Sequence, residues 1–304
     1  MPAKEHERTE VRVEVEGHHL TLVNLEKVMY QRTGTTKGEV LNYYAQVAPR
    51  LLPVPADRAV TRIRWPHGTG EKSFFEKNVP GGTPSWVRTV TVPTTGSRTA
   101  SKESGTLAFP IVDSLATLTW LVNLAALELH VHQWTVDAKG RPEHPDKMVI
   151  DLDPGEPAGL MECSRVALLV RERLAADGLD CLPVTSGSKG IHLYADLSST
   201  GSKPGRRRST DQVRDYAKGI AEELEKAHPD LVVSQMTKAR RSGKVFLDWS
   251  QNSGSKTTIA PYSLRGREVP TVAAPRTWQE VEAGADDPFG IEQLRLDEVL
   301  ARDL

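Results

Sequence analysis

Residues 147–155 read KMVIDLDPG, an apolar run followed by two aspartates one residue apart and then a turn. The β-branched and apolar residues before Pro154-Gly155 predict a strand over 148–153. Side chains two residues apart on a strand point the same way, so Asp151 and Asp153 would lie about 6–7 Å apart at Cα, on one face. Two such carboxylates repel each other unless a cation neutralises them, and oxygen ligands suit hard divalent ions. An isolated DxD is more often a turn that caps the next helix, so other residues must decide.

The composition is that of an ordinary globular protein. Of the 304 residues, 38% are hydrophobic and 26% charged, and no stretch is apolar for long enough to span a bilayer. The N-terminus, MPAKEHERTEVRVEVEG, lacks the apolar segment of a secretory signal. Cys163 and Cys181 have no CxxC spacing, which argues against a disulfide framework or a structural zinc site. We therefore expect a cytoplasmic protein without a membrane partner.

Charge is unevenly distributed along the chain. The net charge is −1, but the last 26 residues are strongly acidic, so the rest of the chain is net positive. Basic residues cluster in KPGRRR (203–208), KARRSGK (238–244) and RGR (265–267). Folding could gather these clusters into a positive face for nucleic acid, although each cluster alone is equally typical of a solvated loop.

Strand and helix patterns are interspersed along the chain. Helical periodicity is present over 36–50, 113–129, 162–177 and 211–228. Strand patterns cover 11–17, 59–65, 107–112, 131–136, 148–153, 190–197 and 244–249. Polar stretches at 94–105, 198–209 and 251–267 are expected to be loops. The predicted fold class is α+β, with mixed or antiparallel central sheets flanked by helices.

A second candidate for chemistry is VTSGSKGIHLYADL (184–197). Ser186 to Gly190 would form a tight turn that leads into a strand carrying His192. Such a turn can offer backbone N–H groups, hydroxyls and the Lys189 ammonium to phosphate oxygens. It is not a P-loop, because GxxxxGK[ST] is absent and a strand follows it. A hairpin with a satisfied core histidine is the alternative interpretation.

The third candidate is KVFLDWSQN (244–252). Asp248 lies in an apolar run, where an unpaired carboxylate is costly, so a cation or hydrogen-bond donors should lie close by. Together with the DxD pair it gives three acidic positions on strands. Two cations about 3.5–4 Å apart, held by shared carboxylates, activate a hydroxyl and stabilise the leaving oxygen in nucleotidyl transfer.

In this order and spacing, DLDPG, SGSKGIH and FLDWSQN closely resemble the polymerase domain of bacterial DNA ligase D, of the archaeo-eukaryotic primase superfamily. The likeness extends over almost the whole chain, through TLVNLEKVMY, TGTTK, RWPHG, FFEK, LELHVHQW, TIAPYSLRGR and AAPRTW. It implies a single primase-polymerase domain over 1–304 with an RRM-like catalytic core. Its parts would be a DNA-binding part at about 1–145, a metal and nucleotide part at about 146–270 and a C-terminal tail at 271–304.

The resemblance implies a template-dependent polymerase that extends a primer 3′-hydroxyl at short gaps or double-strand-break ends. Ribonucleotides would be preferred over deoxyribonucleotides, and the pathway would be non-homologous end joining. Two divalent ions, Mn²⁺ or Mg²⁺, would be held by Asp151, Asp153 and Asp248. The nucleoside triphosphate would contact His130, Ser186, Lys189, His192 and Arg265, with His130 near the sugar.

The resemblance also implies contacts with DNA. Asn24, Lys27 and Lys37 match positions that grip the 5′-phosphate beyond a gap. Phe74 and Phe75 match a pair that stacks on the template. The corresponding alternatives are that Lys27 is solvated surface and that one phenylalanine is core and the other surface. For His130 and His132 we expect one buried and one exposed ring.

Two arginines complete the set of residues implied to contact or align DNA. Arg64, with Arg62, remains for the template phosphates although Ile63 stands where family members can carry lysine. Arg241 would organise the site during end alignment. The stretch 94–105 looks longer than the family loop that aligns broken ends, which weakens the case for end bridging.

The 304 residues contain neither a ligase lysine motif nor a nuclease segment, so we expect a separate DNA ligase and the end-binding protein Ku as partners in the bacterial nucleoid. Two other functions are alternatives for these motifs. A DxD phosphatase would need a small residue or threonine where Pro154 stands. A non-catalytic DNA-end-binding module would not need all three aspartates.

Overall fold

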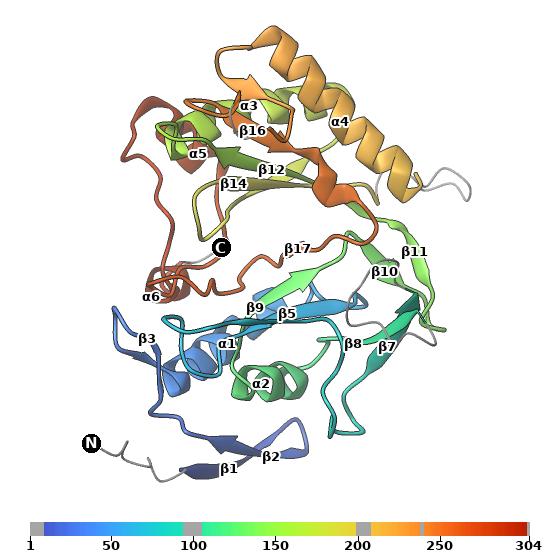
Figure 1. Cartoon of the computed structure of the whole chain (residues 1–304), viewed down its shortest axis with the longest axis vertical. Coiled ribbons are helices and arrows are strands. Elements are labelled where there is room, and N and C mark those ends of the chain that lie inside the picture. Colours follow the sequence, from blue (N-terminus) through green and yellow to red (C-terminus); the bar gives the residue numbers. More distant parts are fainter. Residues whose placement is uncertain (1–8, 94–104, 199–207, 238–239, 303–304) are drawn as a thin grey trace.

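In the computed structural model of the chain, residues 9–93, 105–198, 208–237 and 240–302 are described. Two sheets form the centre of the molecule, one in each half of Figure 1. The six-stranded sheet has the order β15 (Val232–Val233), β16 (Val245–Asp248), β12 (Lys147–Pro154), β14 (Ile191–Asp196), β13 (Cys181–Thr185) and β18 (Ala274–Pro275). The four-stranded sheet has the order β17 (Thr258–Ile259), β9 (Ala126–Val131), β5 (Val60–Arg64) and β6 (Phe74–Glu76).

Almost all strand pairs are antiparallel, and in the named sheets only β15 and β16 run parallel among the described residues. Four two-stranded ribbons surround the sheets. They are β1 (Glu10–Val15) with β2 (His18–Val23), β3 (Val28–Tyr30) with β4 (Thr35–Thr36), β7 (Thr89–Pro93) with β8 (Thr106–Pro110), and β10 (Trp134–Val136) with β11 (Pro142–Pro145).

Each sheet has its own helices (Figure 1). The six-stranded sheet is covered by α3 (Leu160–Ala176) and α4 (Thr210–Ala227), with α5 (Trp278–Asp286) packed on α3. The four-stranded sheet packs on α1 (Lys37–Leu51) and α2 (Leu115–Asn123), and α6 (Leu296–Leu300) adjoins α1. A short 3₁₀ helix, η3 (Trp249–Asn252), follows β16. No helix in the described ranges combines the length and apolar character needed to cross a membrane.

Local sequence explains where α1 begins and how it packs. Thr36 and Glu39 form a capping box, which satisfies free N–H groups of the first turn. The buried face includes Tyr44, whose hydroxyl donates to Leu127 O over 2.6 Å and accepts from Leu264 N over 3.0 Å. This buried hydroxyl therefore links the helix both to β9 and to the loop after β17.

The α+β prediction is confirmed, and the helices expected over 36–50, 162–177 and 211–228 are present within two residues. The helix expected over 113–129 is wrong in its second half. It ends at Asn123, Ala125 has φ +64°, and β9 begins at Ala126. Both faces of β9 are largely buried, and a continuous apolar run does not distinguish a helix from a buried strand.

One further strand prediction is wrong, and two loop predictions stay untested. The strand expected over 131–136 is two strands, because β9 ends at Val131 and β10 begins at Trp134. The expected loops at 94–105 and 198–209 fall almost entirely at 94–104 and 199–207, outside the described residues.

One buried histidine makes a testable contribution to stability. Burial lowers the pKa of His132 to about 4, and the nearby Lys77 and Arg58 charges act in the same direction. Its Nδ1 lies 3.1 Å from Ala59 O. The folded pKa is below the unfolded value, so this stability is present above about pH 6.5 and is lost as the pH falls toward 4.

We therefore predict that the wild type loses about 2 kcal/mol more unfolding free energy than His132→Gln when the pH falls from 7 to 5. Urea unfolding of both proteins at the two pH values measures this difference. Equal losses would contradict the assignment of a buried neutral imidazole.

Candidate active site

The register of the six-stranded sheet brings the three aspartates together. Asp151 on β12 pairs with Asp248 on β16 at one side and with His192 on β14 at the other. Residues paired directly across antiparallel strands project to the same face, so these three side chains form a row. Asp153 follows on that face two residues later. Here the sequence prediction of three neighbouring acidic side chains agrees with the structure.

Each aspartate has at least one polar partner. His192 Nε2 lies 3.2 Å from Asp151 Oδ1. The side chain of Gln251 donates to Asp248 Oδ2 over 2.9 Å and to Asp151 Oδ2 over 3.4 Å. Arg241 Nη1 lies 3.1 Å from Asp153 Oδ2. The row of acids is thus held together by donors from neighbouring segments of the chain.

Arg241 has two further contacts that fix its position. Its guanidinium carbon lies 3.8 Å from the centroid of the Phe246 ring, and Nη2 donates to Met236 O over 2.9 Å. From the resemblance, this arginine is expected to organise the site. The structure places it directly on one of the three aspartates.

The electrostatics of the two β12 aspartates differ. Burial acts to raise the pKa of Asp151, but the charges of His192 and Arg265 outweigh it and the pKa is lowered. Burial raises the pKa of Asp153, the charges of Asp151 and Asp248 add to this rise, and Lys189 and Arg241 oppose it. Such repulsion between carboxylates is relieved by a hard cation, so the donor set fits divalent ions. In the arrangement described, however, no three Asp, Glu, His or Cys side chains are grouped as ligands of one ion within the described ranges.

The turn after β13 differs from the expected phosphate cradle. Its backbone donors are used within the protein: the N–H groups of Ser188 and Gly190 both donate to Ser186 Oγ over 3.2 Å. The N–H of Ser186 donates to Gly190 O over 2.9 Å, and that of Gly187 donates to Gln293 Oε1 over 2.6 Å. These four groups are therefore not free to bind phosphate. The Lys189 side chain is exposed and presents its ammonium to solvent.

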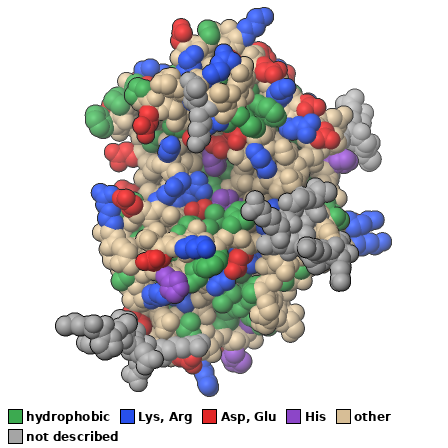
Figure 2. Space-filling model, viewed as in Figure 1, with side chains coloured by type: hydrophobic (Ala, Val, Ile, Leu, Met, Phe, Trp, Pro, Cys, Tyr) green, Lys and Arg blue, Asp and Glu red, His purple; other side chains and the backbone are tan. Residues whose placement is uncertain are grey.

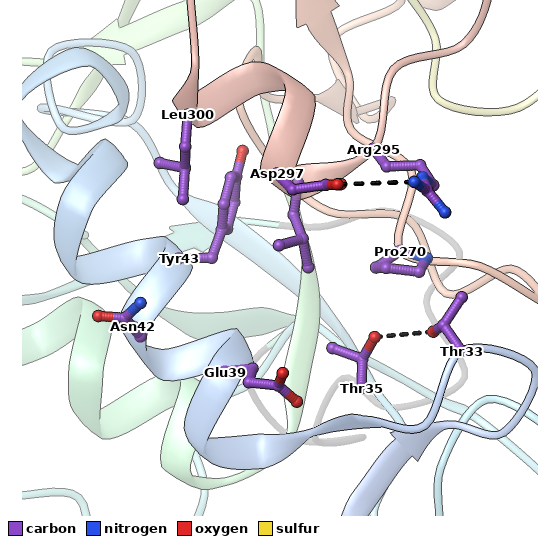
Figure 3. Close-up of a pocket in the computed structure, with 10 residues that line it drawn as sticks. Thr33, Thr35, Glu39, Asn42, Tyr43, Pro270, Arg295, Asp297 and Leu300 are labelled. Carbon is purple, nitrogen blue, oxygen red and sulfur yellow. Dashed lines mark hydrogen bonds and ion pairs between the residues drawn. The ribbon is translucent and has the colours of Figure 1, made fainter.

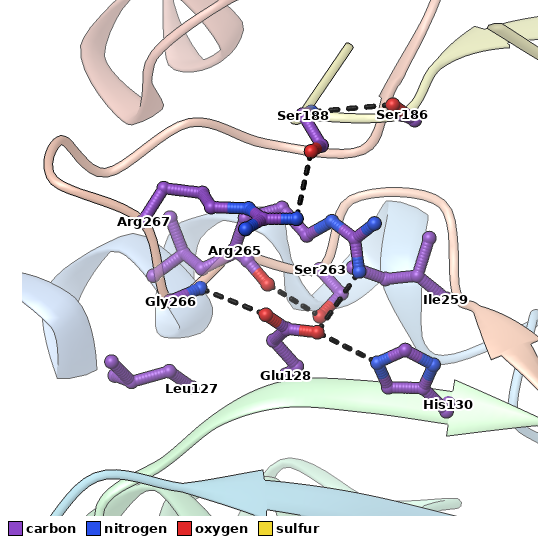
Figure 4. A network of polar contacts seen from close by, with 12 residues as sticks. Leu127, Glu128, His130, Ser186, Ser188, Ile259, Ser263, Arg265, Gly266 and Arg267 are labelled. Carbon is purple, nitrogen blue, oxygen red and sulfur yellow. Dashed lines mark hydrogen bonds and ion pairs between the residues drawn. The ribbon is translucent and has the colours of Figure 1, made fainter. Parts of the chain in front are cut away.

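Glu128, on β9, is a site residue that the sequence analysis missed. Figure 4 shows it between His130, Arg265 and Gly266. Its Oε2 lies 2.7 Å from His130 Nε2 and 3.0 Å from Arg265 Nη1, and its Oε1 accepts from Gly266 N over 2.9 Å. Burial would raise its pKa, but these partners outweigh burial and hold the pKa at about 2. Glu128 could have been found from the sequence, because it is an acid in the apolar strand LELHV, two residues before His130.

His130, on β9, and His132, just after it, are only partly as expected. His132 is buried, as one of the two was expected to be, but His130 is also largely covered, with 12% of its side chain exposed. The buried carboxylate of Glu128 explains this, because it gives the ring of His130 a polar partner inside the protein.

The three residues expected at the 5′-phosphate lie together around the β3–β4 ribbon. Lys27 precedes β3 and Lys37 follows β4, and Lys37 N donates to Lys27 O over 2.8 Å. Asn24 has φ +54°, and its carbonyl accepts from Lys27 N over 3.1 Å. Lys27 Nζ donates to Pro66 O over 2.5 Å, so its ammonium has a protein partner and is not simply solvated.

Lys37 is more enclosed than a surface phosphate ligand usually is. Only 5% of the residue is exposed. Its ammonium donates to Val23 O over 2.7 Å and to Asn123 Oδ1 over 2.9 Å. Asn123 also accepts from Val23 N and donates to Thr21 O. The lysine is therefore held in place by the end of α2 and by β2.

The two phenylalanines lie on the edge strand β6, and neither is a core residue. Phe74 is 44% exposed and Phe75 is 57% exposed. The ammonium groups of Lys72 and Lys77 lie 6.0 Å from the Phe74 and Phe75 ring centroids, respectively. The alternative of one buried and one exposed ring is therefore wrong, and two aromatic rings with adjacent cations are open to a ligand.

Arg62 and Arg64, on β5, both form ion pairs within the protein. Arg62 is 1% exposed, with Nη2 3.2 Å from Glu76 Oε2, so the expectation that it faces a template is wrong. Arg64 Nη1 lies 2.7 Å from Glu76 Oε1, and its side chain is 20% exposed. The Glu76 carboxylate, two residues after Phe74, neutralises both cations. Of the two arginines, Arg64 is the one that keeps part of its side chain at the surface.

Part of the expected positive face lies outside the described residues. Residues 203–207 and 238–239 lie outside the described residues. In Figure 2, Lys and Arg side chains over the middle of the visible face are mixed with Asp and Glu. In the 265–267 cluster, Arg267 Nη2 donates to Ser188 Oγ over 2.8 Å, which joins this loop to the turn after β13.

A separate cavity of about 360 Å³ lies between the start of α1 and α6 (Figure 3). Tyr43 and Leu300 line one part of it, and the ion pair of Arg295 with Asp297, at 3.5 Å, lines another. None of the site residues expected from the sequence lines this cavity.

The buried Glu128 should be important for stability. We predict that Glu128→Gln lowers the unfolding free energy by about 3 kcal/mol, because Arg265 loses its buried counter-ion. Glu268→Gln is the matched control, since its pair with Arg32 is exposed and is expected to contribute at most about 1 kcal/mol. Urea unfolding at pH 7 measures both, and equal effects would argue against a central role for Glu128.

Comparison with known proteins identifies the family of the chain. The family model described as "LigD, primase-polymerase domain" matches residues 36–302. The chain is 48% identical over 288 residues to the multifunctional non-homologous end joining DNA repair protein LigD of Mycobacterium tuberculosis (strain H37Rv), covering 93% of this chain and 35% of that protein. It is 34% identical over 264 residues to the bifunctional non-homologous end joining protein LigD of Bacillus subtilis (strain 168), covering 87% and 40%.

The chain thus spans about a third of the length of the Mycobacterium relative. A solved structure, the polymerase domain from Mycobacterium tuberculosis ligase D in complex with DNA, matches with a TM-score of 0.83 and 47% identity. That match covers 92% of this chain and 93% of the other. The family model, the relatives and the solved structure agree, and the chain belongs to the LigD primase-polymerase domain family.

Proposed function

We propose that the chain is a DNA-directed nucleotidyltransferase that extends a primer 3′-hydroxyl along a template at gaps or broken ends. The observation that carries this proposal is the row of Asp151, Asp248 and His192 across three strands, with Asp153 beside it. A module that only binds DNA ends would have no use for these repelling carboxylates. Membership of the LigD primase-polymerase domain family supports the same activity.

We propose that Asp151, Asp153 and Asp248 hold divalent ions, with Mn²⁺ and Mg²⁺ both suited to their oxygen atoms. When bound, such ions activate the attacking hydroxyl and stabilise charge on the leaving oxygen. Arg241 pairs with Asp153, and Gln251 donates to Asp151 and Asp248. These donors would have to move away before an ion could bind the same oxygen atoms. Until then they keep three neighbouring acids compatible with folding.

The nucleoside triphosphate would lie between the acidic row and the two cationic loops. Lys189 and Arg265 supply positive charge from the turn after β13 and from the loop after β17, and Ser186 shapes the first of these. His192 orients Asp151 from β14, and His130, fixed by Glu128, would face the sugar. We extend the family's ribonucleotide preference to this chain as part of the proposal.

For DNA, we propose that Asn24, Lys27 and Lys37 receive a 5′-phosphate and that Phe74 and Phe75 stack on template bases. The adjacent ends of β3 and β4 and the two exposed rings of β6 support these assignments. Arg64 and Arg241 would align the template and the primer end. A DNA ligase activity and the end-binding protein Ku, in the bacterial cytoplasm, would complete end joining.

The first test is primer extension on a short-gapped duplex with a 5′-phosphate, comparing ribo- and deoxyribonucleotides with manganese or magnesium. We predict that Asp151→Asn lowers extension at least about a hundredfold, because metal contacts are worth several kcal/mol. Binding of the same gapped duplex, measured by fluorescence anisotropy, should remain within about twofold. Parallel loss of both activities would contradict separate metal and phosphate sites.

A second prediction concerns the 5′-phosphate. Lys27→Ala should weaken binding to the 5′-phosphorylated gap and reduce the slope of log affinity against log salt by about 1, as expected for one lost phosphate contact. The same gap without the phosphate is the control substrate, and Lys226→Ala is the control variant, because Lys226 lies in the last turn of α4. An equal effect on both substrates would refute the assignment.

A further inference from the structure

Gln293 lies between α5 and α6, and its side chain bridges the two ends of the turn after β13. Its Oε1 accepts from Gly187 N over 2.6 Å, and its Nε2 donates to Gly190 O over 3.1 Å. One amide thus bonds both ends of the turn that carries Lys189, although it lies more than 100 residues away in sequence. The orientation of this amide is fixed, because Gly187 N–H can only donate and Gly190 C=O can only accept.

The same turn is fixed from a second direction. Thr271 Oγ1 donates to Gly187 O over 2.5 Å. Gly187 has φ +67°, and a Cβ there would lie 2.7 Å from Arg265 Cγ and 2.8 Å from Val272 O. The backbone of the turn therefore rests directly against the loop that carries Arg265, with no space for a side chain between them.

Gln293 is itself anchored to that loop. Val272 N donates to Leu294 O over 2.9 Å, and Arg265 N donates to Thr271 O over 2.8 Å. Hydrogen bonds joined by short stretches of chain thus connect the turn to Arg265, through Gln293, Leu294 and the 271–272 backbone. The two cationic loops of the nucleotide site are connected through the C-terminal segment.

We propose that Gln293 is a positioning residue for nucleotide binding, which holds the turn so that Lys189 and Arg265 face the same triphosphate. The inference rests on the proposed nucleotide site. Lys189 is exposed, so the backbone of the turn is what determines where its ammonium can reach. Loss of the amide would let the turn adopt other conformations, and the lower population of the competent one would weaken nucleotide binding.

A purely structural role for Gln293 makes a different prediction. In that case its loss would lower stability, and its effect on nucleotide binding would be independent of Lys189. If Gln293 acts through the turn, its effect on binding should largely disappear once the Lys189 ammonium is removed. A double-mutant cycle separates these cases, because residues that act through one another are not additive.

The experiment is equilibrium binding of ATP with magnesium, without DNA, to the wild type, Gln293→Met, Lys189→Ala and the double variant. Methionine keeps the length of the side chain and loses both hydrogen bonds. We expect Gln293→Met to weaken binding about five- to tenfold, as for one or two lost hydrogen bonds, and to add less than about twofold to Lys189→Ala. Glu292→Gln, an exposed neighbour, is the matched control and should match the wild type.

Gln293→Glu is a second variant in case the methionine variant does not fold. It keeps the acceptor for Gly187 N, cannot donate to Gly190 O, and should also weaken binding. In primer extension, either variant should raise KM for the nucleotide and leave kcat within about twofold, because chemistry at the aspartates is untouched.

Unchanged ATP binding in folded Gln293 variants would overturn the proposal, and so would effects of Gln293→Met and Lys189→Ala that multiply fully. Failure of the proposed function looks different. In that case the wild type binds ATP but does not extend a primer, and the binding cycle still decides the role of Gln293.

Discussion

The antiparallel register of β12 with β14 and β16 is the constraint on which the site depends. Ile150 and Leu152 are buried against α3 and α4, so the intervening Asp151 and Asp153 must project from the opposite face. A slip of one residue would bury the acids and expose the apolar pair, which is strongly unfavourable. Packing under the helices therefore fixes which face is acidic, and pairing with Asp248 adds the third carboxylate.

A consequence of this register is that folding itself brings like charges together. The repulsion between these carboxylates is reduced by donors from different segments, namely Arg241, Gln251 and His192. In the proposed function the same oxygen atoms bind a divalent ion, so these protein donors and an ion would compete for them. Because Arg241 also packs on Phe246, its release from Asp153 need not displace the whole side chain. Metal binding at this site would then replace protein donors with a cation.

Sequence reasoning was most successful where the relevant spacing is local. The DxD pair follows from the period of a strand, and Thr36 with Glu39 is a capping box readable at three residues' separation. It was least successful where partners are distant. Glu128 has its role only because Arg265 packs against β9, and the backbone donors of the turn after β13 are used up partly because Gln293 is nearby. Neither contact produces a repeating pattern in the sequence from which it could be predicted.

The segment after residue 270 shows why a local pattern cannot define the site. Its apolar residues enter the cores of both halves: Val272 and Val299 pack with α1 and β9, whereas Val281 and Ile291 pack with α3 and β12. Since both helix-covered sheets bury part of it, this acidic segment is held rigidly enough for one amide to fix a turn. The cationic loops are then oriented by packing that involves both halves. It follows that one sheet determines the position of the acidic row. The positions of the cations near it depend on the contact between the two sheets.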